Sequence, residues 1–243
     1  MNGYNNPLMT HLIIGYPSLE ESFNTAELYT QYQPEFLELQ IPFSHPTADG
    51  SKITEANKIA IQKNATTMDD SMNFIERFRK KYPDQKLMIM TYCNKIFRYG
   101  ITEFCRQMDT MGIRYIIITD LPVDSNIAAA IHDNKEIQLV PVIAPNIPEQ
   151  RLNKILSFEP DYIYLMADYK ITGSDFGIHE KLENVVGNIR KRSDARIGIG
   201  FGIGTGAQVK EILELGDFAI IGSELINAQI ENRLEDKLRE LIA

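Results

Sequence analysis

The sequence has few of the residues on which disulfide frameworks and metal sites depend. In 243 residues there are two cysteines and four scattered histidines, namely Cys93, Cys105, His11, His45, His132 and His179. Two cysteines are too few for a disulfide framework, and we expect both to be reduced thiols. The histidines lack the spacing of metal ligands, so the sequence predicts no zinc site.

Long apolar runs and an excess of basic residues are also missing. No apolar stretch approaches the roughly 18 residues that a membrane-crossing helix needs. The start, residues 1–7, has no basic region followed by an apolar one, so we expect no signal peptide and a cytoplasmic protein. The formal net charge of -8 argues against nucleic acid or an acidic membrane as a partner. An anionic substrate would have to be held locally by helix N-termini and backbone amides.

Apolar strand-like runs alternate with helical periods along the chain, and no change in composition marks a linker. The predicted strands span residues 11–15, 36–41, 87–91, 115–119, 137–143, 162–166, 196–200 and 218–221. The predicted helices span about 18–31, 53–63, 68–80, 97–111, 123–132, 148–157, 180–191 and 207–215, with terminal helices from Ser223. This rhythm predicts an α/β fold, a (β/α)8 TIM barrel in a single domain over residues 1–243. A doubly wound open sheet is the alternative, but the polar residues at successive strand ends favour closure.

The second predicted strand, 36–41, carries one acid, and a second acid lies in the loop after it. Alternation puts Glu38 and Gln40 on one face and the aliphatic residues on the other. In a parallel sheet covered by helices, an ionisable group there must be partnered or functional. Two interpretations are open. Either Glu38 and Asp49 form a functional pair, or Glu38 pairs with a neighbouring cation and Asp49 caps the next helix.

Glycines follow the last two predicted strands, at positions 198, 200, 202, 204, 206 and 222. After the last two strands of a barrel, glycines let backbone amides approach an anion, and a short helix adds the positive end of its dipole. Between Arg196 and Ser223 the only other cation is Lys210, so the inferred phosphate would be held mainly by amides. A dinucleotide fingerprint at 202–207 is disfavoured because no βαβ half follows it. Glycines that serve turns only are the other alternative.

Several short motifs, taken together and in order, resemble the α subunit of tryptophan synthase. They are Leu37-Glu38-Leu39, Ile41-Pro42-Phe43-Ser44, Ala48-Asp49-Gly50, Met90-Thr91-Tyr92 with Asn94, Arg98-Tyr99-Gly100, Asp120-Leu121-Pro122, Ile171-Thr172-Gly173, Gly200-Phe201-Gly202-Ile203 and Ile221-Gly222-Ser223. The resemblance covers essentially the whole barrel. It implies a lyase of tryptophan biosynthesis that cleaves indole-3-glycerol phosphate to indole and glyceraldehyde 3-phosphate by a retro-aldol reaction, without a cofactor. It also implies a β-subunit partner, in an α2β2 heterotetramer, that consumes the indole.

The residues that the resemblance implies for the site fit this chemistry. Glu38, at an apolar strand end where burial raises a carboxyl pKa, would protonate C3 of the indole and deprotonate the glycerol hydroxyl. Asp49, in a looser and wetter loop, would accept a hydrogen bond from the indole N–H as an ionised carboxylate. Tyr164 aligns with a tyrosine that lines the substrate site, although beside Tyr162 it can equally be a packing residue, and Thr172 aligns with a loop residue that closes over the ligand. The amides assigned to the phosphate are those of Gly173, Gly202, Gly222 and Ser223.

Three positions depart from the family pattern: Gln40 replaces a glycine, His45 an aspartate and Ser51 a proline. Gln40 shares a face with Glu38, so its side chain could enter the indole pocket or hydrogen-bond Glu38. His45 removes a charge from a loop that faces the β subunit in the family, and Ser51 loosens the loop that carries the second acid. These departures motivate an alternative function, a weakly catalytic α-like subunit that mainly binds and activates a β subunit.

A different phosphate-binding barrel enzyme is the third hypothesis. An isomerase, or the synthase that makes indole-3-glycerol phosphate, would share the glycine-rich phosphate site. The synthase would need catalytic lysines at strand ends, where only Lys95 and Lys170 lie. The sequence therefore disfavours it.

Overall fold

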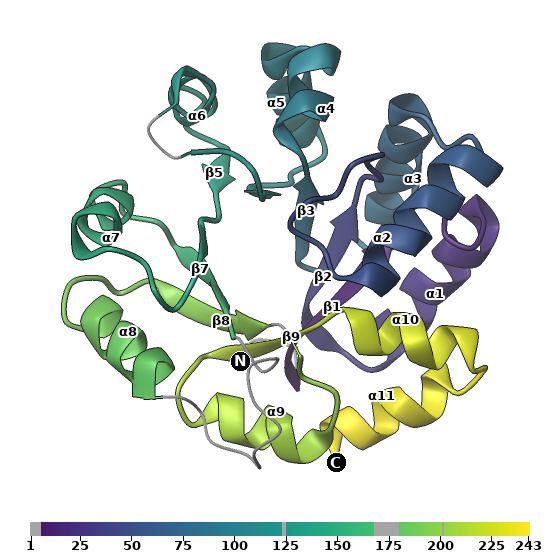
Figure 1. Cartoon of the computed structure of the whole chain (residues 1–243). Coiled ribbons are helices and arrows are strands. Elements are labelled where there is room, and N and C mark those ends of the chain that lie inside the picture. Colours follow the sequence, from purple (N-terminus) through teal and green to yellow (C-terminus); the bar gives the residue numbers. More distant parts are fainter. Residues whose placement is uncertain (1–5, 123–124, 168–179, 201) are drawn as a thin grey trace.

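The strands form one parallel sheet that curls into a barrel in a computed structural model describing residues 6–122, 125–167, 180–200 and 202–243 (Figure 1). The strands are β1 Asn6–Ile13, β2 Pro34–Gln40, β3 Leu87–Thr91, β4 Tyr115–Ile118, β5 Gln138–Leu139, β6 Val142–Ile143, β7 Tyr162–Met166, β8 Arg196–Gly200 and β9 Phe218–Ile221. In the described part of the chain, neighbouring strands of the sheet pair in parallel, which fits a chain in which strands and helices alternate. The predicted TIM barrel is confirmed.

The barrel closes through an interrupted strand. The sheet order is β5-β4-β3-β2-β1-β9-β8-β7-β6, so its two ends are consecutive in the chain and are joined by Val140 and Pro141. The amide of Val140 donates to the Ile116 carbonyl at 2.8 Å, and the Pro141 carbonyl accepts from the Tyr164 amide at 3.0 Å. The single strand predicted at 137–143 is therefore two short strands. Pro141 explains the break because it has no amide to donate to a ladder.

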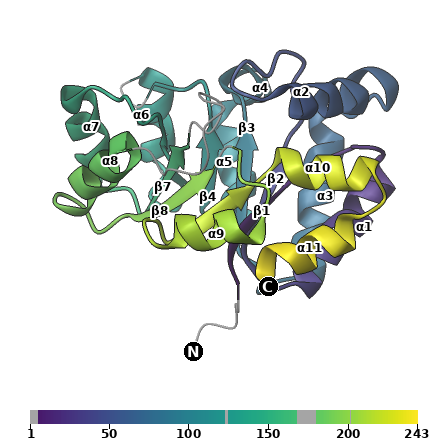
Figure 2. The same ribbon diagram turned by 60° about the horizontal axis from the view of Figure 1, so that its bottom comes forward.

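Helices surround the sheet, and α10 and α11 lie along the same side as α1 (Figure 1 and Figure 2). The helices are α1 Leu19–Gln31, α2 Ser51–Lys58, the π-helix η1 Ile59–Lys63, α3 Met68–Lys81, α4 Cys93–Tyr99, α5 Ile101–Thr110, α6 Asn126–His132, α7 Glu149–Leu156, α8 Glu180–Arg190, α9 Gly206–Leu213, α10 Ser223–Ile230 and α11 Leu234–Ile242. The helix predicted at 97–111 is two helices, because Gly100 breaks it with φ of 100°. None of the helices in the described ranges has the length and apolar character required to cross a membrane.

Two apolar layers lie on the two faces of the sheet. The outer layer packs between strands and helices and includes Leu37, Leu39 and Ile41. The inner layer fills the barrel and includes Phe36, Met88 and Phe218. Glu38 and Gln40 lie two and four residues after Phe36 on β2, so they are on the same face of the strand, and they are 2% and 0% exposed. The predicted alternation therefore holds, and it turns both polar side chains toward the barrel interior.

A charged cluster lies at the amino ends of the strands, against the inner aromatic residues. Arg196 Nη2 donates to Glu35 Oε2 at 2.8 Å, and Lys86 Nζ lies 3.1 Å from Glu35 Oε1. The guanidinium carbon of Arg196 lies 5.9 Å from the ring centroid of Tyr162 and 5.8 Å from that of Phe218. Burial by itself would raise the pKa of Glu35, but the hydrogen bonds and charges of Arg196 and Lys86 lower it overall.

Candidate active site

A cavity of about 500 Å³ lies at the carboxyl ends of the strands. Its lining includes six of the predicted site residues, Glu38, Asp49, Tyr164, Gly202, Gly222 and Ser223. Thr172 and Gly173 lie outside the described residues. Residues that are far apart in the sequence thus meet around one space, as expected where the strands of a barrel end.

Glu38 has a partner that the sequence analysis missed. His11 on β1 lies opposite Glu38 in the parallel register, and its Nδ1 is 3.1 Å from Glu38 Oε2. The two side chains are only 4% and 2% exposed, and both line the cavity. The two interpretations of Glu38 therefore do not exclude each other, since it is paired and it also faces the cavity.

The environment of His11 favours its charged form. Burial lowers the pKa of His11, but the charge and the hydrogen bond of Glu38, with smaller contributions from Asp49 and Gln40, outweigh burial and raise it above 6.5. The sequence did contain a signal for the direction of the His11 side chain, although not for its pairing with Glu38. The alternation that turns Glu38 inward, applied to residues 9–13, also turns His11 inward.

Asp49 is held by Gln40, one of the three residues that the sequence analysis singled out as departures from the pattern that the chain resembles. Gln40 Nε2 donates to Asp49 Oδ2 at 2.8 Å. Burial raises the pKa of Asp49, and this hydrogen bond lowers it in part, so the net direction is upward. Asp49 is therefore less solvated than the sequence analysis predicted for this loop. The alternative role of Asp49 as a helix cap is not seen, because Gly50 is the N-cap of α2 and no side chain caps that helix.

Tyr164 belongs both to the inner apolar layer and to the cavity wall. Its hydroxyl lies over Gly200, where an added Cβ would come within 3.0 Å of that oxygen and 2.9 Å of Ile220 Cβ. A glycine at 200 therefore makes room for the ring. Burial, followed by the charges of Glu38 and Asp49, raises the pKa of Tyr164, so the hydroxyl stays neutral and can donate a hydrogen bond.

Backbone groups dominate the other end of the cavity. α10 begins directly after β9, with Gly222 as its N-cap and no side chain capping it, so its first amides are left for another acceptor. Gly202 lies in the β8–α9 loop with φ of 81°, a conformation that favours glycine. Further along this loop, the amides of Gly204 and Thr205 already donate to Gln208 Oε1 at 2.7 and 3.1 Å. An anion in this region would therefore meet the Gly202 side of the loop and the start of α10.

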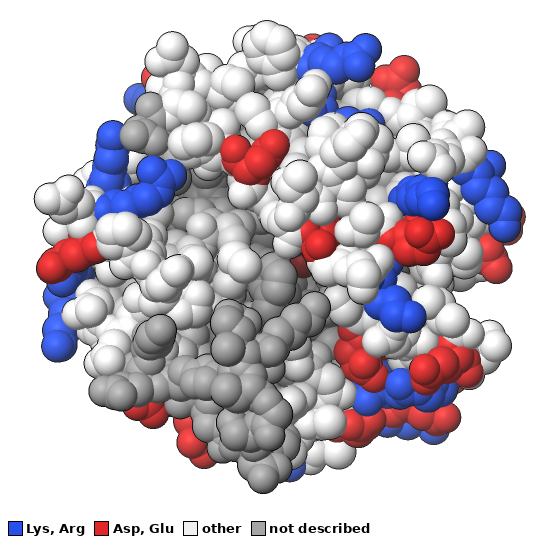
Figure 3. Space-filling view, viewed as in Figure 1, with Lys and Arg blue, Asp and Glu red and all other residues white. Residues whose placement is uncertain are grey.

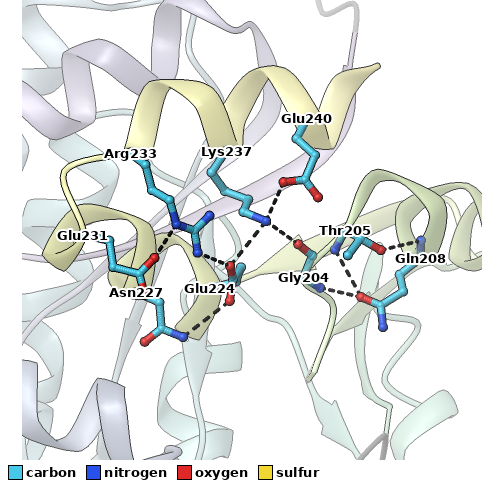
Figure 4. Close-up of polar contacts among 9 residues, drawn as sticks. All are labelled: Gly204, Thr205, Gln208, Glu224, Asn227, Glu231, Arg233, Lys237 and Glu240. Carbon is cyan, nitrogen blue, oxygen red and sulfur yellow. Dashed lines mark hydrogen bonds and ion pairs between the residues drawn. The ribbon is translucent and has the colours of Figure 1, made fainter.

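A buried lysine ties the two glycine-containing turns to the C-terminal helix (Figure 4). Lys237 Nζ donates to the Gly204 carbonyl at 2.8 Å and to Glu240 Oε2 at 2.6 Å, and it lies 3.3 Å from Glu224 Oε1. Arg233 Nη2 also donates to Glu224 Oε1, at 3.0 Å. Gly204 and Glu224 both line the cavity. The network therefore fixes the cavity wall from behind.

On the face that Figure 3 shows, the lysine and arginine side chains lie mainly toward the edge, whereas some acidic side chains lie nearer the middle. Lys52, in the first turn of α2, lines the cavity and is a cation that the sequence analysis did not assign to it. Within the described ranges, no group of three or more histidine, cysteine, aspartate or glutamate side chains could hold a metal ion. The side chains that line the cavity can transfer protons and form hydrogen bonds through three carboxyls, one imidazole, one phenol and the amine of Lys52, in addition to backbone amides.

Known proteins resemble the chain over nearly its whole length. The family model described as tryptophan synthase alpha chain matches residues 2–243. The tryptophan synthase alpha chain of Syntrophotalea carbinolica is 34% identical over 223 residues, which is 90% of this chain and 86% of that protein. That of Thermococcus kodakarensis is 32% identical over 237 residues, 96% and 92% of the two chains.

Solved structures give the same match in three dimensions. Tryptophan synthase subunit alpha from Campylobacter jejuni superposes with a TM-score of 0.84 at 26% identity, covering 97% of this chain and 95% of that one. A chain of the aminoacrylate-bound tryptophan synthase of M. tuberculosis superposes with a TM-score of 0.85 at 25% identity, covering 98% and 92%. The likeness therefore includes the barrel as a whole.

Proposed function

Because the chain belongs to the tryptophan synthase alpha chain family, we propose that it cleaves indole-3-glycerol phosphate to indole and glyceraldehyde 3-phosphate in the cytoplasm, without a cofactor. Membership of the family makes the chain a lyase-type enzyme of tryptophan biosynthesis. The single observation that carries the specific reaction is the common cavity, in which Glu38 and Asp49 line one part and the amide-rich turns line another.

The proposed reaction uses the two carboxyls differently. Glu38 protonates C3 of the indole and then removes the proton of the glycerol hydroxyl, while the carbon–carbon bond breaks and its electrons return to the indole ring. Asp49 accepts a hydrogen bond from the indole N–H, which becomes more acidic as C3 is protonated. Tyr164 supports the substrate between them. The phosphate binds to the amides of Gly202, Gly222 and Ser223, with Thr172 and Gly173, which lie outside the described residues, as further proposed contacts.

We also propose a tryptophan synthase β subunit as the partner, in an α2β2 heterotetramer. The family assignment supports this partner. The loop that faces the β subunit in the family carries the exposed residues Ser44 and His45 here. Since His45 replaces an aspartate of the family pattern, we expect its contribution to that contact to be a hydrogen bond rather than a fixed negative charge.

The test is indole release by the Glu38→Gln variant. The substitution keeps the size of the side chain and removes its acid–base function, so we expect the rate to fall roughly 10²-fold or more. The matched control is Glu76→Gln on α3, where the side chain is half exposed and pairs with Lys80. It should release indole at the wild-type rate.

The assay should be run with and without a purified β subunit. An unchanged rate in Glu38→Gln would refute the assignment of this residue. A wild-type chain that releases almost no indole in either condition, yet activates the β subunit, would instead support the alternative of a weakly catalytic binding subunit. Turnover of other sugar phosphates would point to a different barrel enzyme.

A further inference from the structure

His11 meets the requirements of a residue that works through Glu38. It lies on the strand next to Glu38, points into the barrel, and directs its Nδ1 to Glu38 Oε2 at 3.1 Å. A Cβ added at Gly222 would lie 3.7 Å from His11 Cβ and 3.8 Å from its Cγ, so the imidazole is packed against the turn that begins α10. The side chain is thus fixed on two sides.

The second nitrogen of the ring has no partner within the described part of the chain. His11 Nε2 is buried and makes no hydrogen bond there. Nδ1 makes the ion-pair contact with Glu38, and Gln40 adds a smaller side-chain contribution. Burying an imidazole costs free energy unless its polar contacts are strong, and the contact with a carboxylate is strongest when the imidazole is charged.

We propose that His11 is a positioning residue for the retro-aldol reaction: it holds one oxygen of Glu38, leaves the other free for both proton transfers, and stabilises the carboxylate that forms after Glu38 has given its proton to C3 and before it takes the proton of the glycerol hydroxyl. The inference rests on the proposed function of the site. It adds a third titratable group to the pair of carboxyls that the sequence indicated. His11 exchanges no proton with the substrate in this scheme, and Glu38 ends each cycle as it began.

The charges around His11 determine how its contribution depends on pH. Glu38 faces it from β2, Asp49 acts on it from the β2–α2 loop, and Gln40 contributes a neutral amide, while the β9–α10 turn presents Gly222, which cannot titrate. The acids keep the imidazole protonated to a higher pH than a free histidine. Activity should therefore decline as the pH rises through the pKa of His11, when the positive charge beside Glu38 is lost.

The decisive variants are His11→Asn and His11→Phe. Asparagine can still donate to Glu38 from its amide but carries no charge, whereas phenylalanine removes both. We expect kcat to fall roughly 10-fold in the first and 10²-fold in the second, with KM changed less than twofold because the phosphate contacts remain. The alkaline decline of kcat should disappear in His11→Asn. His132→Asn is the control. The ring of His132 stacks on that of Phe158, with the ring centroids 4.9 Å apart, and His132 does not line the cavity.

Titration of the imidazoles by NMR separates this inference from the proposed reaction. In the free wild-type chain the His11 signal should titrate above pH 6.5, and Glu38→Gln should lower its midpoint. A midpoint that does not respond to Glu38→Gln, or a pH profile of His11→Asn identical to that of the active wild type, would overturn the role of His11 alone. The proposed function would be overturned instead if the His11 midpoint responds to Glu38→Gln but the wild-type chain releases no indole with its β partner.

Discussion

Each of the two carboxyls has a built-in partner, and the partners differ in kind. Glu38 is paired with an imidazole that can carry a charge, and Asp49 with the neutral amide of Gln40. Titratable groups whose surroundings differ can take different roles in one reaction. The two acids are therefore held by separate partners, Glu38 by His11 on β1 and Asp49 by Gln40 on β2.

Gln40 is the residue through which the acid side of the pH profile can be tested. Gln40→Met keeps the volume of the side chain but removes the donor that favours the ionised form of Asp49. The pKa of Asp49, already raised by burial, should rise further. Because the proposed role needs the carboxylate, activity is present above this pKa, and the acid limb of kcat/KM should move to higher pH.

The measurement is kcat/KM for indole release across the acid limb, for wild type, Gln40→Met and Gln107→Met. Gln107 bonds to Tyr99 and Glu103 on the outer helices and leaves the cavity untouched. If the acid limb of Gln40→Met coincides with that of the control, Gln40 does not act through Asp49.

At this scale the sequence predicts the acids better than their partners. Glu38 and Asp49 stand out because a charge in an apolar strand and an acid in the loop after it are visible without a structure. The pairing of His11 with Glu38 depends on which strands are neighbours and on their register, which no local pattern of residues 9–13 contains. The bond from Gln40 to Asp49 depends on how the loop folds back over its own strand end.

Among the elements, the first turn of α10 depends on a lysine from α11. Lys237→Met would remove the charge-assisted hydrogen bond to the Gly204 carbonyl and one partner of Glu224. We expect the free energy of unfolding to fall by about 1.5–3 kcal/mol, the usual range for hydrogen bonds to charged groups. KM for a phosphate-bearing substrate should rise severalfold because Gly204 and Glu224 line the cavity.

Arg239→Met is the comparison on the same helix. Its side chain is 65% exposed and pairs with Glu235 one turn away, so we expect a change in unfolding free energy within about 0.5 kcal/mol. Urea unfolding and substrate saturation curves test both variants. Equal effects of the two substitutions would show that Lys237 is only another surface charge.

Most elements follow from periodicity, and the exceptions have identifiable causes. The strand predicted at 87–91 has the bounds of β3, since its apolar run is closed on both sides by polar residues. The helix predicted at 97–111 fails at Gly100, whose positive φ cannot be read from an amphipathic pattern. The split of β5 from β6 could have been inferred from Pro141, which an internal strand position does not tolerate.

For the molecule as a whole, the cluster at the amino ends of the strands sets part of the pH dependence of stability. The folded-state pKa of Glu35 lies below its ordinary value of 4.5. A lowered pKa contributes stability above the ordinary value, and this contribution is lost as the pH falls through the folded-state pKa. Glu35→Gln should therefore lower the unfolding free energy at pH 7 by about 1.5–3 kcal/mol, and its difference from wild type should shrink below pH 4.5.

Urea unfolding between neutral and acid pH measures this difference. The control is Glu136→Gln, an exposed site before β5. A difference between wild type and Glu35→Gln that stays constant with pH would mean that the ionisation of Glu35 is not what stabilises this end of the barrel.

The interrupted strand at Val140 and Pro141 is where the barrel has the fewest backbone pairs. β5 and β6 each share two register positions with a neighbour, whereas β1 and β2 share six. Spontaneous opening begins where such bonds are sparse. We therefore expect local opening of the barrel along residues 138–143. Because Val142 lines the cavity, this part of the wall can move most easily when a bulky aromatic ligand enters or leaves.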